Sequence, residues 1–166
     1  MKYNNYFDTD YQHDDAYLAI VSDLLVTPQV QLLNNYVQHH FKSRLDHSLA
    51  VSYVSYKLAL KYGLDAVSVA RAGLVHDLFY YDWRETSFEL GSHSFIHPRV
   101  ALRNAEKIMS LTSLEKDIIL HHMFPSGGGL PQSREAWLVN FVDDWLAVRE
   151  GVLGFVLKFK RSFVSN

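Results

Sequence analysis

Apolar residues recur at spacings of three and four through most of this 166-residue chain, the period of an α-helix that buries one face. The first such stripe lies in residues 14–26 and consists of Leu18, Val21, Leu24 and Leu25. Runs that alternate apolar and polar residues between turn residues, which would indicate β-strands, are scarce. We therefore expect an all-α fold, a bundle of about six to eight helices.

Start and stop signals set the expected boundaries of the helices. A Thr-Pro pair at 27–28 predicts a helix over residues 28–40, because proline is favoured at the first helical position. A His-Pro pair at 97–98 gives the same signal for a helix over residues 97–110. The other predicted helices are residues 46–63, 65–78, a segment that opens with the capping box Thr112–Glu115, and 133–151.

The chain contains no linker, internal repeat or low-complexity segment, so we expect one domain over residues 1–166. Its parts are N-terminal helices at 14–40, a core at 41–150 that holds the candidate site, and a tail at 151–166. Two aperiodic stretches, 79–96 and 125–131, are predicted loops. Residues 152–163 mix large apolar residues with basic ones. This pattern predicts a short amphipathic helix that packs on its own domain, with a partner or a membrane surface as alternatives.

Composition excludes several classes of protein and of site. The chain has no cysteine, which excludes disulfides, thiolate zinc sites and cysteine nucleophiles, so any metal must be held by imidazole and carboxylate. A net charge of −2 with 20% charged residues does not predict a nucleic-acid partner. The first ten residues do not resemble a signal peptide, and no apolar run is long enough to span a membrane. We therefore expect a cytoplasmic protein.

Several of the ionisable residues lie on otherwise apolar helix faces. They are His47, His76, Asp77, His122 and Asp143. Burying an isolated charged or polar group is costly unless the group is paired or bound to a metal. A shared cation would offset all of these costs together. A ligand set of imidazoles and carboxylates favours divalent manganese, iron, cobalt or magnesium, with zinc less favoured.

Each of these residues also has a purely structural interpretation. A single histidine on an apolar face is more often a hydrogen-bonded core residue than a ligand. An aspartate such as Asp46 or Asp65 is most simply a helix cap, and His97 could simply begin its helix. The recurrence of such residues on several helices nevertheless predicts a metal site in the core of the bundle.

Five short strings, in this order, resemble the HD superfamily of metal-dependent phosphohydrolases. They are RLDHSLAVS (44–52), ARAGLVHDLFYYDW (70–83), HSFIHPRVAL (93–102), IILHHMFP (118–125) and NFVDDWLA (140–147). The resemblance covers about residues 40–150 and is greatest to a group of small bacterial members without a settled substrate. It implies a compact HD-like helical bundle. The chain lacks the Gly-Tyr-Pro string of the cyclic-dinucleotide branch, so cyclic-di-GMP is not the expected substrate.

The resemblance also implies a ligand set. The metal-binding positions of the superfamily correspond here to His47, His76, Asp77 and Asp143 for one ion, and to His97 and His122 for a second. Asp77 would then bridge the two ions. Two of these positions have a neighbour of the same type. We favour His122 over His121 on the superfamily spacing, and Asp143 over Asp144 because Asp144 shares its helix face with Asn140.

Hydrolysis at such a site uses metal-activated water, with Asp77 as the bridging catalytic residue. The leaving group needs a proton or a cation, and His93 and His121 are the candidates for that role. Candidate substrate-binding residues, each of which could also be an ordinary surface residue, are Arg84, Arg99 and His40. Aromatic residues that could stack on a base, or simply pack the loop, are Phe79, Tyr80, Tyr81 and Trp83.

Three functions are therefore consistent with the sequence. The expected one is a phosphomonoesterase or phosphodiesterase that binds one or two divalent metal ions and acts on a nucleotide or other small phosphate ester. The alternatives are an HD-type di-iron oxygenase and a metal-stabilised module that binds a nucleotide without turnover. We expect a small phosphorylated ligand and allow for a homodimer, but we expect neither nucleic-acid nor membrane partners.

Overall fold

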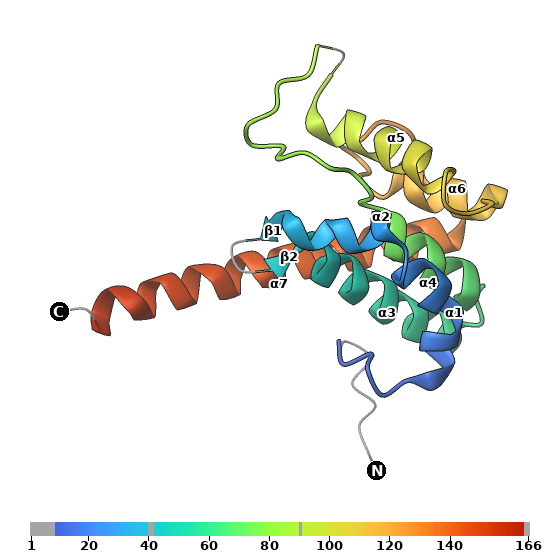
Figure 1. Ribbon diagram of the computed structural model, residues 1–166, viewed down its shortest axis with the longest axis horizontal. Helices are drawn as coiled ribbons and strands as arrows, with labels where there is room; N and C mark the ends of the chain where they lie inside the picture. The colour runs from blue at the N-terminus through green and yellow to red at the C-terminus, as the bar shows by residue number, and fades with distance from the viewer. Residues whose placement is uncertain (1–8, 40–41, 90, 165–166) are drawn as a thin grey trace.

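The protein is a bundle of α-helices with one small sheet in the part that the computed structural model describes, residues 9–39, 42–89 and 91–164 (Figure 1). The elements are α1 (Asp15–Leu25), α2 (Pro28–Gln31), the 3-10 helix η1 (Leu32–Asn35), β1 (Val37–His39), β2 (Lys42–Ser43), α3 (Arg44–Tyr62), α4 (Ala66–Val75), α5 (His93–Ala105), α6 (Ser113–His121) and α7 (Arg134–Val164). The expected all-α fold and number of helices are confirmed.

Helix α3 is the centre of the bundle, and its main neighbours are α4 and α7. It begins with a capping box in which the Ser43 side chain accepts from the amide of Asp46 and the Asp46 carboxylate accepts from the amide of Ser43. It ends at Gly63, whose φ of 63° is the left-handed conformation that glycine adopts without strain. Most side chains of α3 are buried, so the helix presents His47 to the interior of the bundle.

Helix α4 packs closely against α3. Its N-cap is Asp65, as expected, and the Asp65 side chain accepts from the amide of Ser68. A Cβ atom at Gly73 would lie 3.0 Å from the Cα of Ser52, so only glycine allows the two helices to approach this closely. Helix α4 ends at Val75, three residues before the expected end, and the chain leaves it directly into the His-Asp pair.

The prediction of a continuous helix over residues 28–40 is wrong. Helix α2 lasts for only four residues, and η1 and the antiparallel pair β1–β2 follow it. Asn34 and Asn35 explain the break, because asparagine side chains compete for backbone hydrogen bonds and disfavour a helix interior. The small sheet turns the chain back into α3. His40 lies outside the described residues.

Helix α5 begins at His93, one turn before the expected start at His97, which is therefore wrong. Ser92 is the N-cap, with an extended backbone, and Pro98 lies within the helix. The side chain of His97 donates from Nδ1 to the carbonyl of His93 at 3.0 Å, which fixes the orientation of the His97 ring. His93 and His97 thus lie one turn apart on the same helix face.

The prediction that the last helix ends at Gly151 is also wrong, because α7 continues to Val164. Gly151 does not have the positive φ of a helix-terminating glycine, and so the expected separate tail helix is the second half of α7. Figure 1 shows this half extending away from the bundle. Among the described residues no single helix is long and apolar enough to cross a membrane. The two segments Asp15–Leu25 and Pro28–Asn35, which meet at a bend, would together be long and apolar enough by length and composition alone.

Candidate metal centre

Six imidazole and carboxylate side chains from five helices converge in the interior of the bundle. Each is supplied by the end or inner face of a helix: His47 by the first turn of α3, His76 and Asp77 by the end of α4, His97 by α5, His122 by the end of α6 and Asp143 by α7. All six are buried, with at most 7% of any residue exposed. They are the six residues that the sequence analysis proposes as metal ligands.

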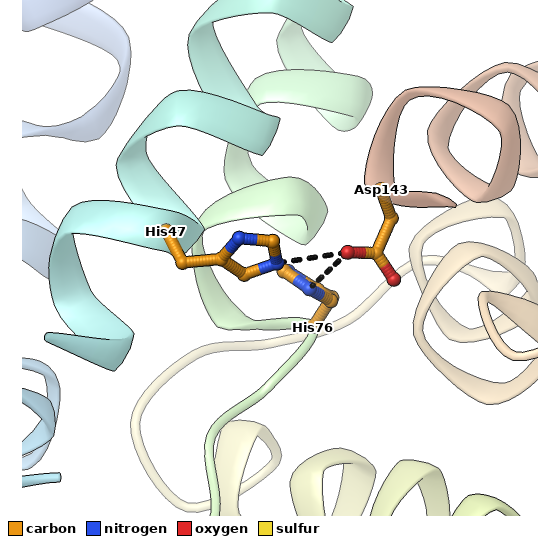
Figure 2. Close-up of side chains that lie close together, drawn as sticks. All are labelled: His47, His76 and Asp143. Carbon is orange, nitrogen blue, oxygen red and sulfur yellow. Dashed lines mark hydrogen bonds and ion pairs between the residues drawn. The ribbon is translucent and has the colours of Figure 1, made fainter. Parts of the chain in front are cut away.

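The first group of potential ligands is His47, His76 and Asp143, which Figure 2 shows converging from three elements. His47 Nε2 lies 2.8 Å from Asp143 Oδ1, and His76 Nε2 lies 3.7 Å from the same oxygen. Each residue offers one donor atom, and these atoms all lie within 4.8 Å of one another. One divalent ion can contact three donors at this spacing.

The second group is His76, Asp77 and His122, whose donor atoms also lie within 4.8 Å of one another. His97 adjoins it, since His97 Nε2 lies 2.8 Å from His122 Nε2 and 3.2 Å from Asp77 Oδ1. His76 is the residue that the two groups share. The bridging role of Asp77 stays a prediction.

Backbone carbonyls fix how three of the imidazoles face the centre. In His76, His97 and His122 the Nδ1 atom lies within 3.0 Å of a carbonyl oxygen three or four residues earlier, that of Gly73, His93 and Ile119 respectively. A carbonyl only accepts hydrogen bonds, so each Nδ1 carries the hydrogen. In the neutral ring the lone pair is then on Nε2 and faces the other ligands, which is the orientation that metal-binding histidines adopt.

A bound cation would resolve several otherwise unfavourable contacts at this centre. His76 Nε2 and Asp77 Oδ1 are buried and have no hydrogen-bond partner among the residues that the structure describes. The Nε2 atoms of His97 and His122 lie 2.8 Å apart although both present lone pairs, an arrangement that repels unless a proton or a metal lies nearby. Buried polar groups normally have partners. The donors therefore fit a divalent metal that accepts nitrogen and oxygen ligands.

The structure adds Glu150 of α7, which the sequence analysis did not identify. Glu150 Oε2 lies 3.2 Å from His47 Nδ1, and Lys42 Nζ lies 3.1 Å from Glu150 Oε1. Burial lowers the pKa of His47, but its hydrogen bonds with Asp143 and Glu150 outweigh this effect and raise the pKa to about 10. Glu150 follows Asp143 by two helical turns, so the spacing of carboxylates along α7 was the available signal.

Gln38 and Arg44 hold the carboxylate of Asp77 in position, a role that was not predicted. Gln38 Nε2 donates to Asp77 Oδ2 at 2.7 Å, and Arg44 Nε donates to Gln38 Oε1 at 2.9 Å. The Arg44 guanidinium, which is fully buried, also donates to the carbonyls of Phe79 and Tyr81. Arg44 thus ties the chain after α4 to the start of α3. Nothing in the sequence separates this arginine from a surface residue.

A cavity of about 230 Å³ opens beside the ligands. Its lining comprises Gln38, His47, Asp77, Trp83, His93, His97, Met123, Asp143, Asp144 and Ala147. The ring of His93 stacks between those of Trp83 and His97, at centroid distances of 5.4 and 4.3 Å. Burial, together with the nearby His97, lowers the pKa of His93 to about 4. The lowered pKa disfavours the protonated ring of His93, and its expected role as proton donor stays a prediction.

Three other candidate substrate-binding and catalytic residues are not among the described residues that line this cavity: His121, Arg84 and Arg99. His121 directs Nδ1 to Asp117 Oδ1 at 2.7 Å. Arg84 donates to the carbonyl of Val37 and to Asp82. Arg99 donates to two backbone carbonyls and lies 3.5 Å above the ring of Phe95. The structure thus brings His122 and Asp143 into the centre in preference to their neighbours, while Asp144 lies on the cavity wall.

Comparison with known proteins agrees with this geometry. The family model of the HD domain matches residues 44–147, which extend from the start of α3 to within α7 and include all six proposed ligands. No curated protein matches the chain, and no solved structure matches it. The HD superfamily consists largely of metal-dependent hydrolases, and HD domains bind divalent metal ions. Because the match covers more than half of its length, this chain belongs to the HD domain family.

Proposed function

We propose that this protein is a metal-dependent phosphohydrolase that acts on a nucleotide or another small phosphate ester. One observation carries the proposal: imidazole nitrogens and carboxylate oxygens converge beside a cavity, with their lone pairs directed to a common centre. A site that served only to stabilise the fold would not require a cavity next to the ligands. A hydrolase needs one, because substrate and water must reach the same atoms.

The proposed ligands form two groups, one for each metal ion. His47, His76 and Asp143 would hold one ion, and Asp77, His97 and His122 would complete a second site. Bound divalent ions supply activated water and neutralise charge on the phosphoryl oxygens.

Hydrogen bonds from neighbouring side chains hold two of the proposed ligands in position. Gln38 fixes one oxygen of Asp77 and leaves the other directed to the histidines, while Glu150 fixes the ring of His47. Such outer contacts keep the ligands in place without the cost of reorganisation during the reaction. His93 lines the cavity and its Nδ1 has no hydrogen-bond partner among the described residues, which supports a role in hydrogen bonding to the substrate.

The test combines metal analysis with turnover. The protein is purified with added Mn²⁺, its metal content is measured, and phosphate release is followed on a panel of nucleotides and other phosphate esters. We expect at least one ion per chain, release of phosphate from some member of the panel, and loss of both on Asp77→Ala. Asp15→Ala, which removes an exposed carboxylate from the first turn of α1, is the matched control and should retain both.

Two results would contradict the proposal. Metal-loaded protein without activity on any phosphate ester would favour a binding module. Oxygen consumption by an iron-loaded sample, without phosphate release, would favour the di-iron oxygenase.

A further inference from the structure

The charges around the cavity limit which phosphate ester it can accept. Three carboxylates line it, those of Asp77, Asp143 and Asp144. None of its lining residues within the described part of the chain is lysine or arginine. Two of the carboxylates belong to the proposed metal centre, whose bound cations would compensate them. Asp144 is the remaining negative charge, and no lysine or arginine among the described lining residues balances it.

The nearby arginines are engaged elsewhere. Arg44 is buried against Gln38 and two carbonyls, and it lies 3.6 Å from the centre of the Phe79 ring. Arg84 and Arg99 donate to backbone carbonyls outside the lining of the cavity. A guanidinium grips phosphate best when two of its N–H groups are free to form parallel hydrogen bonds. None of these three is placed as a clamp for additional phosphate groups.

Asp144 has no compensating partner of its own. It follows Asp143 on α7, is exposed, and forms no hydrogen bond or ion pair with any residue that the structure describes. A carboxylate without a cationic partner on the wall of the cavity repels further negative charge brought close to it.

The size and walls of the cavity point to one compact ligand. Its volume of about 230 Å³ is below the ~300–1,000 Å³ typical of sites for drug-sized ligands. Trp83 is 39% exposed and stacks on His93, so the two rings lead from solvent towards the metal centre. An aromatic group of the substrate can pack on such a surface while its phosphate reaches the metal ligands.

We propose that the cavity selects a monophosphate ester of a compact aromatic group, such as a nucleoside monophosphate, over the corresponding triphosphate, and that Asp144 is the residue that rejects the additional phosphates. This inference rests on the proposed function of the same site. It assigns Asp144 to specificity, whereas the neighbouring Asp143 binds metal.

The experiment compares AMP with ATP on the full chain loaded with Mn²⁺. We expect kcat/KM for AMP to exceed that for ATP by about tenfold or more, which corresponds to ~1.4 kcal/mol or more. Asp144→Asn should narrow this ratio by raising kcat/KM for ATP, and Asp144→Lys should narrow it further. Asp15→Asn, which removes the same charge from the surface of α1, should leave the ratio unchanged.

A binding measurement separates this inference from the proposed function. Non-hydrolysable methylene analogues of AMP and ATP are titrated into the loaded protein, and the tryptophan fluorescence is followed. We expect tighter binding of the monophosphate analogue and a smaller difference in Asp144→Asn. If no ester is hydrolysed, the proposed function fails, but this preference can still be measured. Equal or tighter binding of the triphosphate analogue, or a preference that Asp144→Asn leaves unchanged, would overturn the inference.

Discussion

Glu150 and His47 are 103 residues apart in the chain, yet Glu150 Oε2 lies 3.2 Å from His47 Nδ1. The opposite nitrogen of the same ring, Nε2, lies 2.8 Å from Asp143. Two carboxylates on one face of α7 therefore hold the imidazole from both sides. The contact with Asp143 belongs to the proposed metal centre. The contact with Glu150 fixes the ring that would bind the metal.

This arrangement predicts that Glu150 controls metal affinity without being a ligand. Glu150→Ala should weaken Mn²⁺ binding by about 10–100-fold, the usual effect of removing an outer partner of a metal-binding histidine. Glu150→Gln should weaken it less, since the amide oxygen can still accept from Nδ1. Equilibrium titration with a metal indicator measures both. Glu106→Ala, which removes an exposed glutamate paired with Lys116, is the control, and an equal effect there would argue against the assignment.

A second prediction concerns the buried Arg44. Arg44→Met should lower the free energy of unfolding by about 1–3 kcal/mol for each buried acceptor left without a partner, and the carbonyl of Phe79 is the most buried of these. Arg71→Met, which breaks a more exposed ion pair with Asp23, should cost less. Urea unfolding of the two variants makes the comparison. A smaller loss for Arg44→Met than for Arg71→Met would contradict the prediction.

The close approach of α3 and α4 gives a third prediction, which uses two glycines with opposite expected effects. Gly73→Ala should destabilise the protein by about 1–3 kcal/mol, because the new methyl group would meet the backbone of Ser52 at 3.0 Å. Gly151→Ala should stabilise it by about 0.5–1 kcal/mol, because that position lies inside α7 with nothing within 4 Å. Thermal unfolding reports both signs. Stabilisation by Gly73→Ala would contradict the tight contact between α3 and α4, and destabilisation by Gly151→Ala would contradict the open surroundings of that glycine.

Asp117 provides a prediction about pH. Burial raises the pKa of Asp117, but hydrogen bonds from Ser133, the amide of Gln132 and His121 outweigh this effect and lower the pKa below its ordinary value of 3.8. A lowered pKa in the folded state means that the carboxylate stabilises the protein above pH 3.8 and that this contribution is lost as the pH falls below it.

Two variants test this sign. Asp117→Asn should reduce the free energy of unfolding at pH 7, and the difference from the unmodified protein should shrink as the pH falls below 3.8. Asp15→Asn, at an exposed position, should produce no such pH-dependent difference. Urea unfolding at pH 7, 5 and 3.5 measures it. A difference that grows towards acid pH would reverse the assigned sign.

Much of the fold could be read from local patterns. Helical periodicity gave the bundle, and capping signals gave several ends correctly, among them Asp65 at the start of α4 and Gly63 after α3. Local patterns failed where two conformations share one signal. A proline such as Pro98 can occupy the first turn of a helix or the second. A glycine such as Gly151 can end a helix or lie in its interior.

By itself, the sequence determined the class of the fold, the absence of thiolate ligands and the six side chains proposed to bind metal. Only the tertiary structure decided that His122 and not His121 faces the centre, and that Gln38, Arg44 and Glu150 support it. The physical reason is the range of the interactions. Periodicity and capping depend on neighbours within one or two helical turns, whereas these contacts join segments that meet only once the bundle has packed.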